Sequence, residues 1–246
     1  VLELIDFING KLGMIKGVDY RYRLSLGDRN DTKKYYKDDA SWDYSEKVLR
    51  EVLTKLKAPF YEAVNEAAFY GPKIDIQVKK ADGKEETAFT VQYDFVMPER
   101  FDLVFTNEKG KDERPVVIHR SSIGCLERTI AFLIEKYKGN FPTWLTPVQV
   151  KVLPITEKHL DYAKKVGDKL KEEGIRVEVD ERNERLQAKI RDAQLEKVAY
   201  MLIVGDREEK EGTVSERGRS GKDYGAQPLD KFIENVKKEI DKKIIN

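Results

Sequence analysis

The sequence is poor in residues that form covalent or metal cross-links, with one cysteine, Cys125, and two histidines among 246 residues. A single cysteine cannot form a disulfide within the chain. A zinc site needs three or four ligands, and Cys125 with two histidines does not obviously supply them. A lone thiol suits a reducing compartment, so we expect a cytoplasmic protein.

Long apolar runs and an excess of charge are also absent. No stretch approaches the roughly 20 apolar residues of a membrane-spanning helix, and the first residues, VLELIDFINGKLG, lack the features of a signal peptide. We therefore expect no membrane contact. The 46 basic and 45 acidic residues leave a formal net charge of +1, so any contact with nucleic acid must come from a local patch.

Apolar residues make up 40% of the chain, which is enough to build one large or two ordinary domains. The sequence begins without a methionine and directly in an apolar pattern. We therefore expect a segment of a longer chain.

The first half of the sequence predicts helices and antiparallel strands. Apolar residues at helical spacing predict helices over about residues 4–12 and 42–57, and residues 19–25 alternate like a half-buried strand. Alternation with period two continues through KIDIQVK, TAFTVQYDF and RFDLVF, which predicts a meander, and PVVIH adds another strand. The following SSIGCLERTIAFLIEKY predicts a helix capped by Ser121 or Ser122.

The second half alternates strands with helices. Strands are predicted at VQVKVLP, IRVEVD and AYMLIVG, and helices over about residues 157–173, 184–196 and 228–243. This order is typical of an α/β domain with a mixed, largely parallel sheet. The segment FPTWLTP interrupts all periodicity, so we divide the chain into domains over residues 1–144 and 145–246.

Two motifs of the first domain combine turns with cations. In AFYGPKIDI a Gly-Pro turn separates Tyr70 from Lys73, which could approach a phosphate; the alternative is an ordinary turn with a solvated lysine. In IHRSSIGCLER a strand end and a helix start bring His119 and Arg128 together, an arrangement that suits anions. The alternatives are a solvated charged helix face and a structural histidine.

A third motif, VDERNERLQAKIRDAQ, gathers cations and an asparagine at the start of a helix. Its members are Arg182, Asn183, Arg185, Lys189 and Arg191. Asparagine and arginine are side chains that read unpaired base edges and stack on exposed bases. A solvated helix with paired charges is the alternative. Aromatic residues are sparse in this half, so an extended stacking platform for single strands is not expected.

In order and spacing, these motifs together resemble the later half of the threonyl-tRNA synthetases, from residue 20 to 245. The matching segments are FYGPKIDI, TVQYDFVMPERFDL, PVVIHRSSIGCLER, FPTWLTPVQV, GIRVEVDERNERLQAKIRDAQ and YMLIVGDREEKEGTVSERGRSG. The resemblance implies an α+β class II catalytic domain built on an antiparallel sheet, followed by an α/β anticodon-binding domain. It implies ATP-dependent activation of threonine, with magnesium, and transfer to tRNA(Thr) by a homodimer.

The resemblance also implies roles for four residues of the first domain. Lys73 and Arg128 become the catalytic candidates, with Lys73 near the reacting carboxylate and α-phosphate and Arg128 at the γ-phosphate. Tyr70 falls near the threonine, and Gln92 is a further substrate- or ATP-binding residue. Guanidinium groups suit phosphate because they can bind it in a bidentate manner.

Three positions concern the metal and departures from the family pattern. His119 corresponds to a zinc ligand of the family, whose other ligands would lie upstream of this chain, so we expect one ligand here and an inactive segment. Cys125 stands where the family usually has serine, and we place it at the substrate, with a plain buried thiol as the alternative. Residues 87–90 read TAFT where the family has QCGT, so this segment departs from the family at the place where adenosine or ribose contacts are expected.

Residues that would read the anticodon also follow from the resemblance. They are Asn183, Arg191, Glu208 and Arg217, and Lys197 is expected to contact phosphate. Two other interpretations stay open: another class II synthetase (prolyl, glycyl or histidyl), and a synthetase-like RNA-binding subunit without catalysis.

Overall fold

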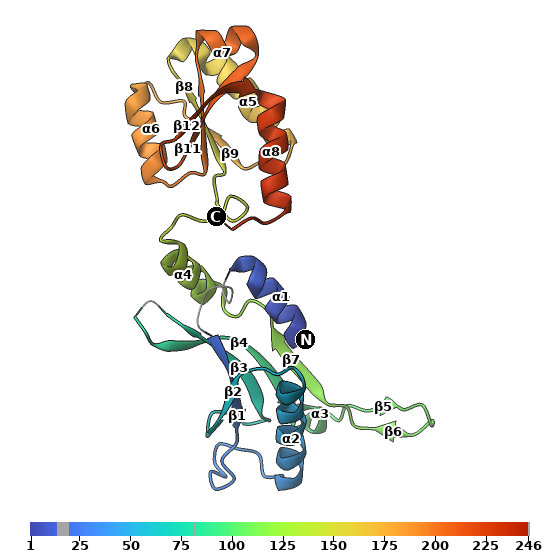
Figure 1. Cartoon of the computed structure of the whole chain (residues 1–246). Helices are drawn as coiled ribbons and strands as arrows, with labels where there is room; N and C mark the ends of the chain where they lie inside the picture. Colours follow the sequence, from blue (N-terminus) through green and yellow to red (C-terminus); the bar gives the residue numbers. More distant parts are fainter. Residues whose placement is uncertain (14–19, 81, 246) are drawn as a thin grey trace. The chain divides into compact units, whose positions relative to one another are not determined.

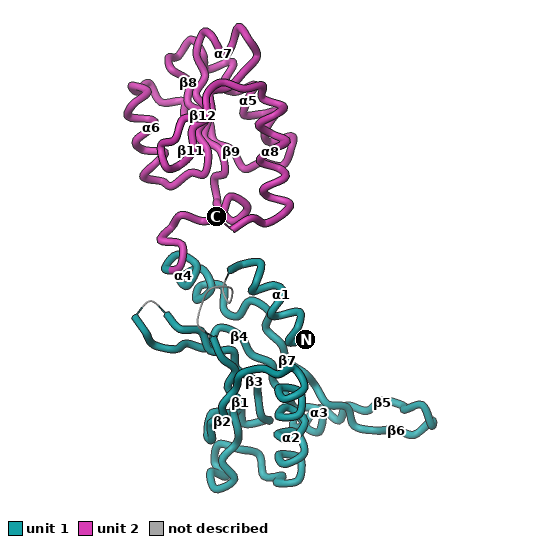
Figure 2. Tube along the Cα trace, in the orientation of Figure 1, with its two compact units in different colours: residues 1–135 teal, residues 136–246 magenta. Residues whose placement is uncertain are grey.

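The computed structural model describes residues 1–13, 20–80 and 82–245. The chain divides into two compact units, Val1–Glu135 (unit 1) and Lys136–Asn246 (unit 2), shown in Figure 2. None of the described helices has the length and apolar character to cross a membrane.

Unit 1 is a five-stranded sheet with helices, as the fold class predicted (Figure 1). Its elements are α1 (Leu2–Leu12), β1 (Tyr20–Leu26), α2 (Asp39–Lys55), β2 (Phe60–Val64), β3 (Lys73–Lys79), β4 (Glu85–Asp94), α3 (Met97–Arg100), β5 (Phe105–Thr106), β6 (Asp112–Glu113), β7 (Val117–Ser121) and α4 (Leu126–Tyr137). The sheet order is β2-β1-β3-β4-β7, with β1 and β2 parallel and the other pairs antiparallel. Strands β5 and β6 form a separate hairpin.

The two faces of this sheet differ because side chains alternate along each strand. One face is apolar and carries Tyr22, Leu24, Ile74, Ile76, Phe89 and Val91, all buried. Helices α1 and α2 lie along this face, and Leu2 and Leu49 line a cavity with Ile74 and Val91. The other face is polar, and its side chains form the candidate site described below.

The structure departs from the sequence-based prediction at three places in unit 1. Strand β2 was not predicted. RFDLVF was wrongly predicted as a strand: it contributes only Phe105 to β5, because Asp94 caps α3 and Pro98 stands in the first turn of that helix. The helix predicted after β7 begins at Leu126, so the cap expected from Ser121 or Ser122 is wrong. Asp19, expected in the first strand, lies outside the described residues.

Unit 2 is an α/β domain with a mixed sheet, again as predicted. Its elements are β8 (Val150–Pro154), a 3-10 turn η1 (Glu157–His159), α5 (Leu160–Glu172), β9 (Val177–Val179), α6 (Leu186–Leu195), β10 (Tyr200–Val204), α7 (Asp206–Glu211), β11 (Thr213–Gly218), β12 (Asp223–Pro228) and α8 (Leu229–Asp241). In the order β12-β11-β10-β8-β9, the pairs β10-β8 and β8-β9 are parallel. The antiparallel strands β11 and β12 were not predicted.

Both faces of the unit 2 sheet are covered by helices, which Figure 1 shows on either side of the strands. Helices α5 and α8 cover one face, where Leu170 and Phe232 pack on Val152 and Leu202. Helix α6 covers the other face through Ile190 and Ala193. Because β8, β9 and β10 are parallel, their carboxyl ends share one edge of the sheet. This edge is the usual place for a ligand in such sheets.

The turn before β3 depends on Gly71. A Cβ on this residue would lie 1.8 Å from the carbonyl oxygen of Tyr93, and its φ is +155°. We predict that Gly71→Ala destabilises unit 1 by at least about 3 kcal/mol, because two backbone segments would have to move apart. Unfolding of the 246-residue chain, followed by circular dichroism, measures the effect.

Gly10 provides the control for this prediction. A Cβ there would meet nothing within 4 Å, and the residue lies inside helix α1. Gly10→Ala should therefore stabilise the helix by about 0.5–1 kcal/mol. Equal unfolding midpoints for the two variants would show that the turn accepts a side chain.

Candidate active site and nucleic-acid interface

A row of four polar side chains crosses the polar face of unit 1. Ser25 on β1 pairs with Lys73 on β3, Lys73 with Gln92 on β4, and Gln92 with His119 on β7. Residues directly opposite each other in antiparallel strands point to the same face with Cβ atoms about 5 Å apart. The sheet therefore brings together Lys73, Gln92 and His119, three of the residues selected from the sequence.

A buried carboxylate fixes the lysine of this row. Oδ2 of Asp75 accepts hydrogen bonds from Arg23 at 2.8 Å and from the Ser25 hydroxyl at 2.7 Å. It also lies 3.2 Å from Nζ of Lys73. Asp75 is fully buried, so its charge requires these partners. The sequence analysis missed Asp75, although its position two residues after Lys73 places it on the same face.

The tyrosine of the turn reaches the same row. The Tyr70 hydroxyl donates a hydrogen bond to Oε1 of Gln92, and its ring centroid lies 5.4 Å from that of His119. Burial, with a further contribution from the nearby Asp94 charge, raises the pKa of Tyr70, so the hydroxyl keeps its proton. Because Oε1 of Gln92 accepts this hydrogen bond, the amide nitrogen of Gln92 points away from the turn.

Asp94 orients the histidine. Its Oδ2 lies 2.7 Å from Nε2 of His119, while its Oδ1 accepts the backbone N–H groups of Val96 and Met97. An ionised carboxylate can only accept, so Nε2 carries the proton and Nδ1 keeps its lone pair in the neutral ring. Asp94 was also missed from the sequence, although it follows Gln92 by two residues on one strand.

Arg128 lies at the far end of β3 and β4 from Lys73, beside Glu86, whose cross-strand partner Val78 belongs to the apolar face. Its Nη1 donates to the carbonyl oxygen of Thr87 at 2.8 Å, and its Nε pairs with Glu86 at 3.0 Å. Glu86 pairs with Val78, five residues beyond Lys73 on β3, which corresponds to about 16 Å along the strand. The structure therefore does not bring the two catalytic candidates into contact.

The departures from the family pattern have clear positions. Phe89 is 1% exposed and pairs with Ile76, so its ring lies on the apolar face and not in the site. Thr87 accepts a hydrogen bond from Gln77 on the polar face. Cys125 is exposed, and its thiol donates to Glu127, so the buried-thiol alternative is wrong.

His119 is the one candidate zinc ligand that was selected from the sequence. His119 is 46% exposed at its side chain, and no partner of its Nδ1 is found in the described part of the chain. A ligating histidine usually donates its other ring nitrogen to a carboxylate, which matches the contact with Asp94. However, no group of three or more His, Cys, Asp or Glu side chains suitable for a metal occurs among residues 1–13, 20–80 and 82–245.

Unit 2 has a cavity of about 560 Å³ at the carboxyl ends of β8 and β9. Its walls are formed by residues 154–158 after β8 and 181–185 after β9, with Lys189 of α6 behind them. The Lys189 ammonium donates to the carbonyl oxygens of Pro154 and Asp180, and burial lowers its pKa. Asn183, selected from the sequence, is exposed in this wall.

Arg182, next to Asn183, is held by two carboxylates. Its Nε and Nη2 bind Asp180 at 2.9 and 2.6 Å, and its Nη1 binds Asp192 at 2.9 Å. These hydrogen bonds, first those to Asp180, raise the pKa of Arg182. Burial would raise the pKa of Asp180, but the hydrogen bonds and charge of Arg182 outweigh it and keep that pKa below its ordinary value.

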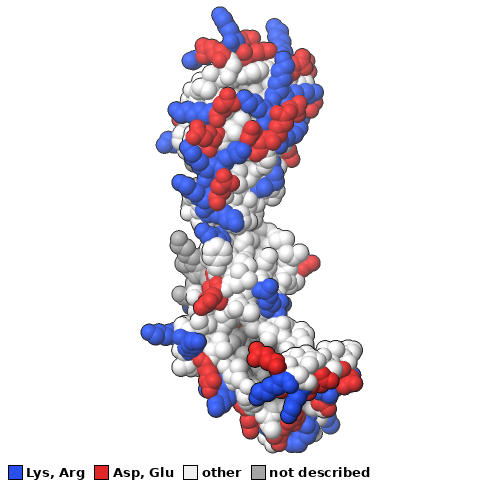
Figure 3. Space-filling view, turned by 90° about the vertical axis from the view of Figure 1, so that its right-hand side faces the viewer, with Lys and Arg blue, Asp and Glu red and all other residues white. Residues whose placement is uncertain are grey.

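The other anticodon candidates are distributed over the unit. Arg191 is exposed on α6 and lies 3.3 Å from Asp192, and Glu208 accepts the N–H of Gly205 at the start of α7. Arg217 lies on β11 opposite Met201, toward the amino end of β10. Figure 3 shows basic and acidic side chains interspersed over the visible face of this unit. The cavity therefore contains only Asn183 of the four.

Lys197, expected to contact phosphate, lies away from the cavity. It lies after α6, at the amino end of β10, and its ammonium donates to the carbonyl oxygen of Lys138. Because the cavity is at the carboxyl ends of the parallel strands, Lys197 lies at the opposite edge of the sheet. The phosphate contact, expected because the family often has arginine at this position, stays a prediction.

Comparisons with known proteins match both units. The family described as "tRNA synthetase class II core domain (G, H, P, S and T)" matches residues 22–137, and "Anticodon binding domain" matches residues 149–239. The threonine–tRNA ligase of Clostridium botulinum (strain Eklund 17B / Type B) is 49% identical over 240 residues, which are 98% of this chain and 37% of that protein. That of Geobacillus kaustophilus (strain HTA426) is 54% identical over 216 residues, 87% of this chain and 33% of that protein.

Solved structures agree with the sequence comparison. The RNA-binding domain of threonyl-tRNA synthetase from Cryptosporidium parvum Iowa II has a TM-score of 0.86 at 33% identity, covering 97% of this chain and 58% of that one. The chain spans 37% or less of the length of the curated relatives described above. By sequence and fold, the chain belongs to the threonyl-tRNA synthetase family and contains its class II core and anticodon-binding sequences.

Proposed function

We propose that this chain belongs to a threonine–tRNA ligase. It would provide the β-sheet that forms one side of the threonine-activating site, and it would provide the anticodon-binding domain. The observation that carries the proposal is the polar row, in which Lys73, Gln92 and His119 stand side by side with Tyr70 bonded to Gln92. The full protein would activate threonine with ATP and magnesium and transfer it to tRNA(Thr). A homodimer is proposed on the family resemblance, and a cytoplasmic location on the single cysteine of the chain.

Activation requires two anions to be held together. The threonine carboxylate attacks the α-phosphate, and negative charge then develops on the leaving pyrophosphate. Lys73 is suited to this task because Asp75 holds its ammonium at the start of β3. Arg128, fixed by Thr87 and Glu86, would contact the γ-phosphate. Tyr70 and Gln92 would bind the substrate, and Cys125 would line the same site.

His119 would act as one ligand of a zinc ion through Nδ1, since Nε2 donates to Asp94. A bound zinc supplies a Lewis acid for the amino and hydroxyl groups of threonine. Valine has no hydroxyl to bind the zinc ion, so the site would discriminate against valine.

The first test concerns Lys73 in a full-length threonine–tRNA ligase that carries this segment. We predict that Lys73→Ala lowers threonine-dependent pyrophosphate exchange by roughly 30- to 1000-fold, the range for loss of a contact worth about 2–4 kcal/mol in the transition state. Lys47→Ala is the control, because Lys47 is exposed on α2 and its ion-pair partner is Glu51 on the same helix. Exchange within about threefold of wild type for Lys73→Ala would contradict the role.

A second test concerns the metal. We predict that the purified 246-residue chain holds no stoichiometric zinc, because His119 offers one ligand where a catalytic site needs about three. Elemental analysis after dialysis measures the metal content. One zinc per chain in wild type, lost in His119→Ala, would show that other side chains of this chain complete the site.

For the second domain we propose that Asn183, Arg191, Glu208 and Arg217 read the anticodon. Asn183 lies in the wall of a cavity at the carboxyl edge of the sheet, where its amide can donate and accept hydrogen bonds with a base edge. We place the domain boundary between residues 144 and 145, which falls between the family matches ending at 137 and beginning at 149.

The third test measures binding of a threonine anticodon stem-loop to the 246-residue chain. We predict that Asn183→Ala reduces discrimination against altered anticodons by roughly 5- to 150-fold, equivalent to about 1–3 kcal/mol per base. Asn235→Ala, exposed on α8, is the control. If Asn183→Ala retains full discrimination while wild type discriminates, Asn183 does not read a base.

A further inference from the structure

The guanidinium of Arg182 is unusually restricted for an exposed side chain. It is 49% exposed, yet three of its N–H groups are directed at carboxylates of Asp180 and Asp192. Asp180 is itself 4% exposed and follows β9, and Asp192 belongs to α6. Two separate elements of the domain therefore fix the plane of the guanidinium in the wall of the cavity.

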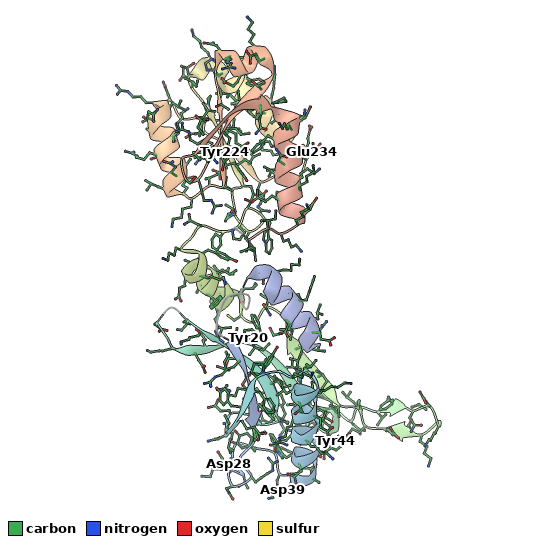
Figure 4. All side chains as sticks on the ribbon, in the orientation of Figure 1. Tyr20, Asp28, Asp39, Tyr44, Tyr224 and Glu234 are labelled. Carbon is green, nitrogen blue, oxygen red and sulfur yellow. The ribbon has the colours of Figure 1, made fainter. Side chains whose placement is uncertain are left out.

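No aromatic side chain is among the described lining residues of the cavity, whose walls contain two guanidinium groups, those of Arg182 and Arg185. Of these two, the described residues hold only Arg182 through carboxylates. The exposed Tyr224, labelled in Figure 4, belongs to β12 and lies beside Gly218. Gly218 pairs with Tyr200, the first residue of β10, so Tyr224 lies toward the amino edge of the sheet. A base that entered the cavity would meet in Arg182 a planar group whose position is fixed.

We infer that Arg182 is a stacking platform for one unpaired base of the bound RNA. This inference rests on the proposed anticodon-binding function and adds a residue to it. Guanidinium planes stack on exposed bases, and stacking tolerates a guanidinium whose N–H groups already have partners. Asn183, the next residue, would then meet the edge of the same or the adjacent base.

The charges around Arg182 disfavour a phosphate contact. Its one positive charge is offset by the negative charges of Asp180 and Asp192, so the three groups together carry a formal charge of −1. Arg191 differs, because its side chain is 72% exposed and its contacts with Asp192 are 3.3 Å or longer. Arg191 thus retains donors for a phosphate or a base edge, whereas Arg182 presents mainly its face.

The test uses the 246-residue chain and anticodon stem-loops in which each loop nucleotide in turn is abasic. Arg182→Lys keeps the charge but removes the plane, and should weaken binding of the intact RNA roughly 5- to 150-fold, the range for loss of one base stack. For one abasic RNA, wild type and Arg182→Lys should bind equally. The dependence of affinity on salt should have the same slope for both proteins.

Arg50→Lys is the matched control, since Glu62 holds Arg50 in a similar bidentate contact on unit 1, and it should change nothing. Thermal unfolding of each variant separates a folding defect from a binding defect, and Arg182→Gln gives a second, uncharged variant. An equal loss on every abasic RNA, or a salt slope lowered by about one in Arg182→Gln, would overturn the stacking role. Absence of stem-loop binding by wild type would overturn the anticodon function as well.

Discussion

The alternation of side chains along β1, β3 and β4 is the constraint on which unit 1 depends. Leu24, Ile74 and Val91 point to the face covered by α1 and α2, and the residues between them have to point the other way. Placing the apolar side chains on one face thus places a row of polar side chains on the other. The same register places Lys73 beside Gln92 without any need for flexible loops.

Carboxylates repeatedly hold the side chains to which we assign chemistry. Asp75 binds Lys73, Asp94 binds His119, Glu86 binds Arg128, and two carboxylates bind Arg182. A buried carboxylate without a partner is costly, so the buried Asp75, Asp94 and Asp180 each favour one position of the cation or ring. Such fixed positions suit a site that has to hold substrate groups in a defined orientation.

The candidate site of unit 2 is formed by loops and not by the face of a sheet. Its parallel strands β10, β8 and β9 end at one edge, and the loops after β8 and β9 leave a cavity there. Lys189 connects the two loops by donating to a carbonyl at the end of each strand. The cavity and the Arg182 platform therefore depend on α6, which carries both Lys189 and Asp192.

Local residue order was sufficient to predict most helices and the central strands, because period and turn chemistry are local properties. The class II fold and site residues such as Gln92, Glu208 and Arg217 followed from the family resemblance. Local residue order failed for RFDLVF, where Asp94 caps a helix that removes the chain from the sheet. It also could not supply contacts between distant segments. Asp94 meets His119 across 25 residues, and Arg182 meets Asp192 across ten. Strand register and helix packing create these contacts, and sequence periodicity carries no information about which register is adopted.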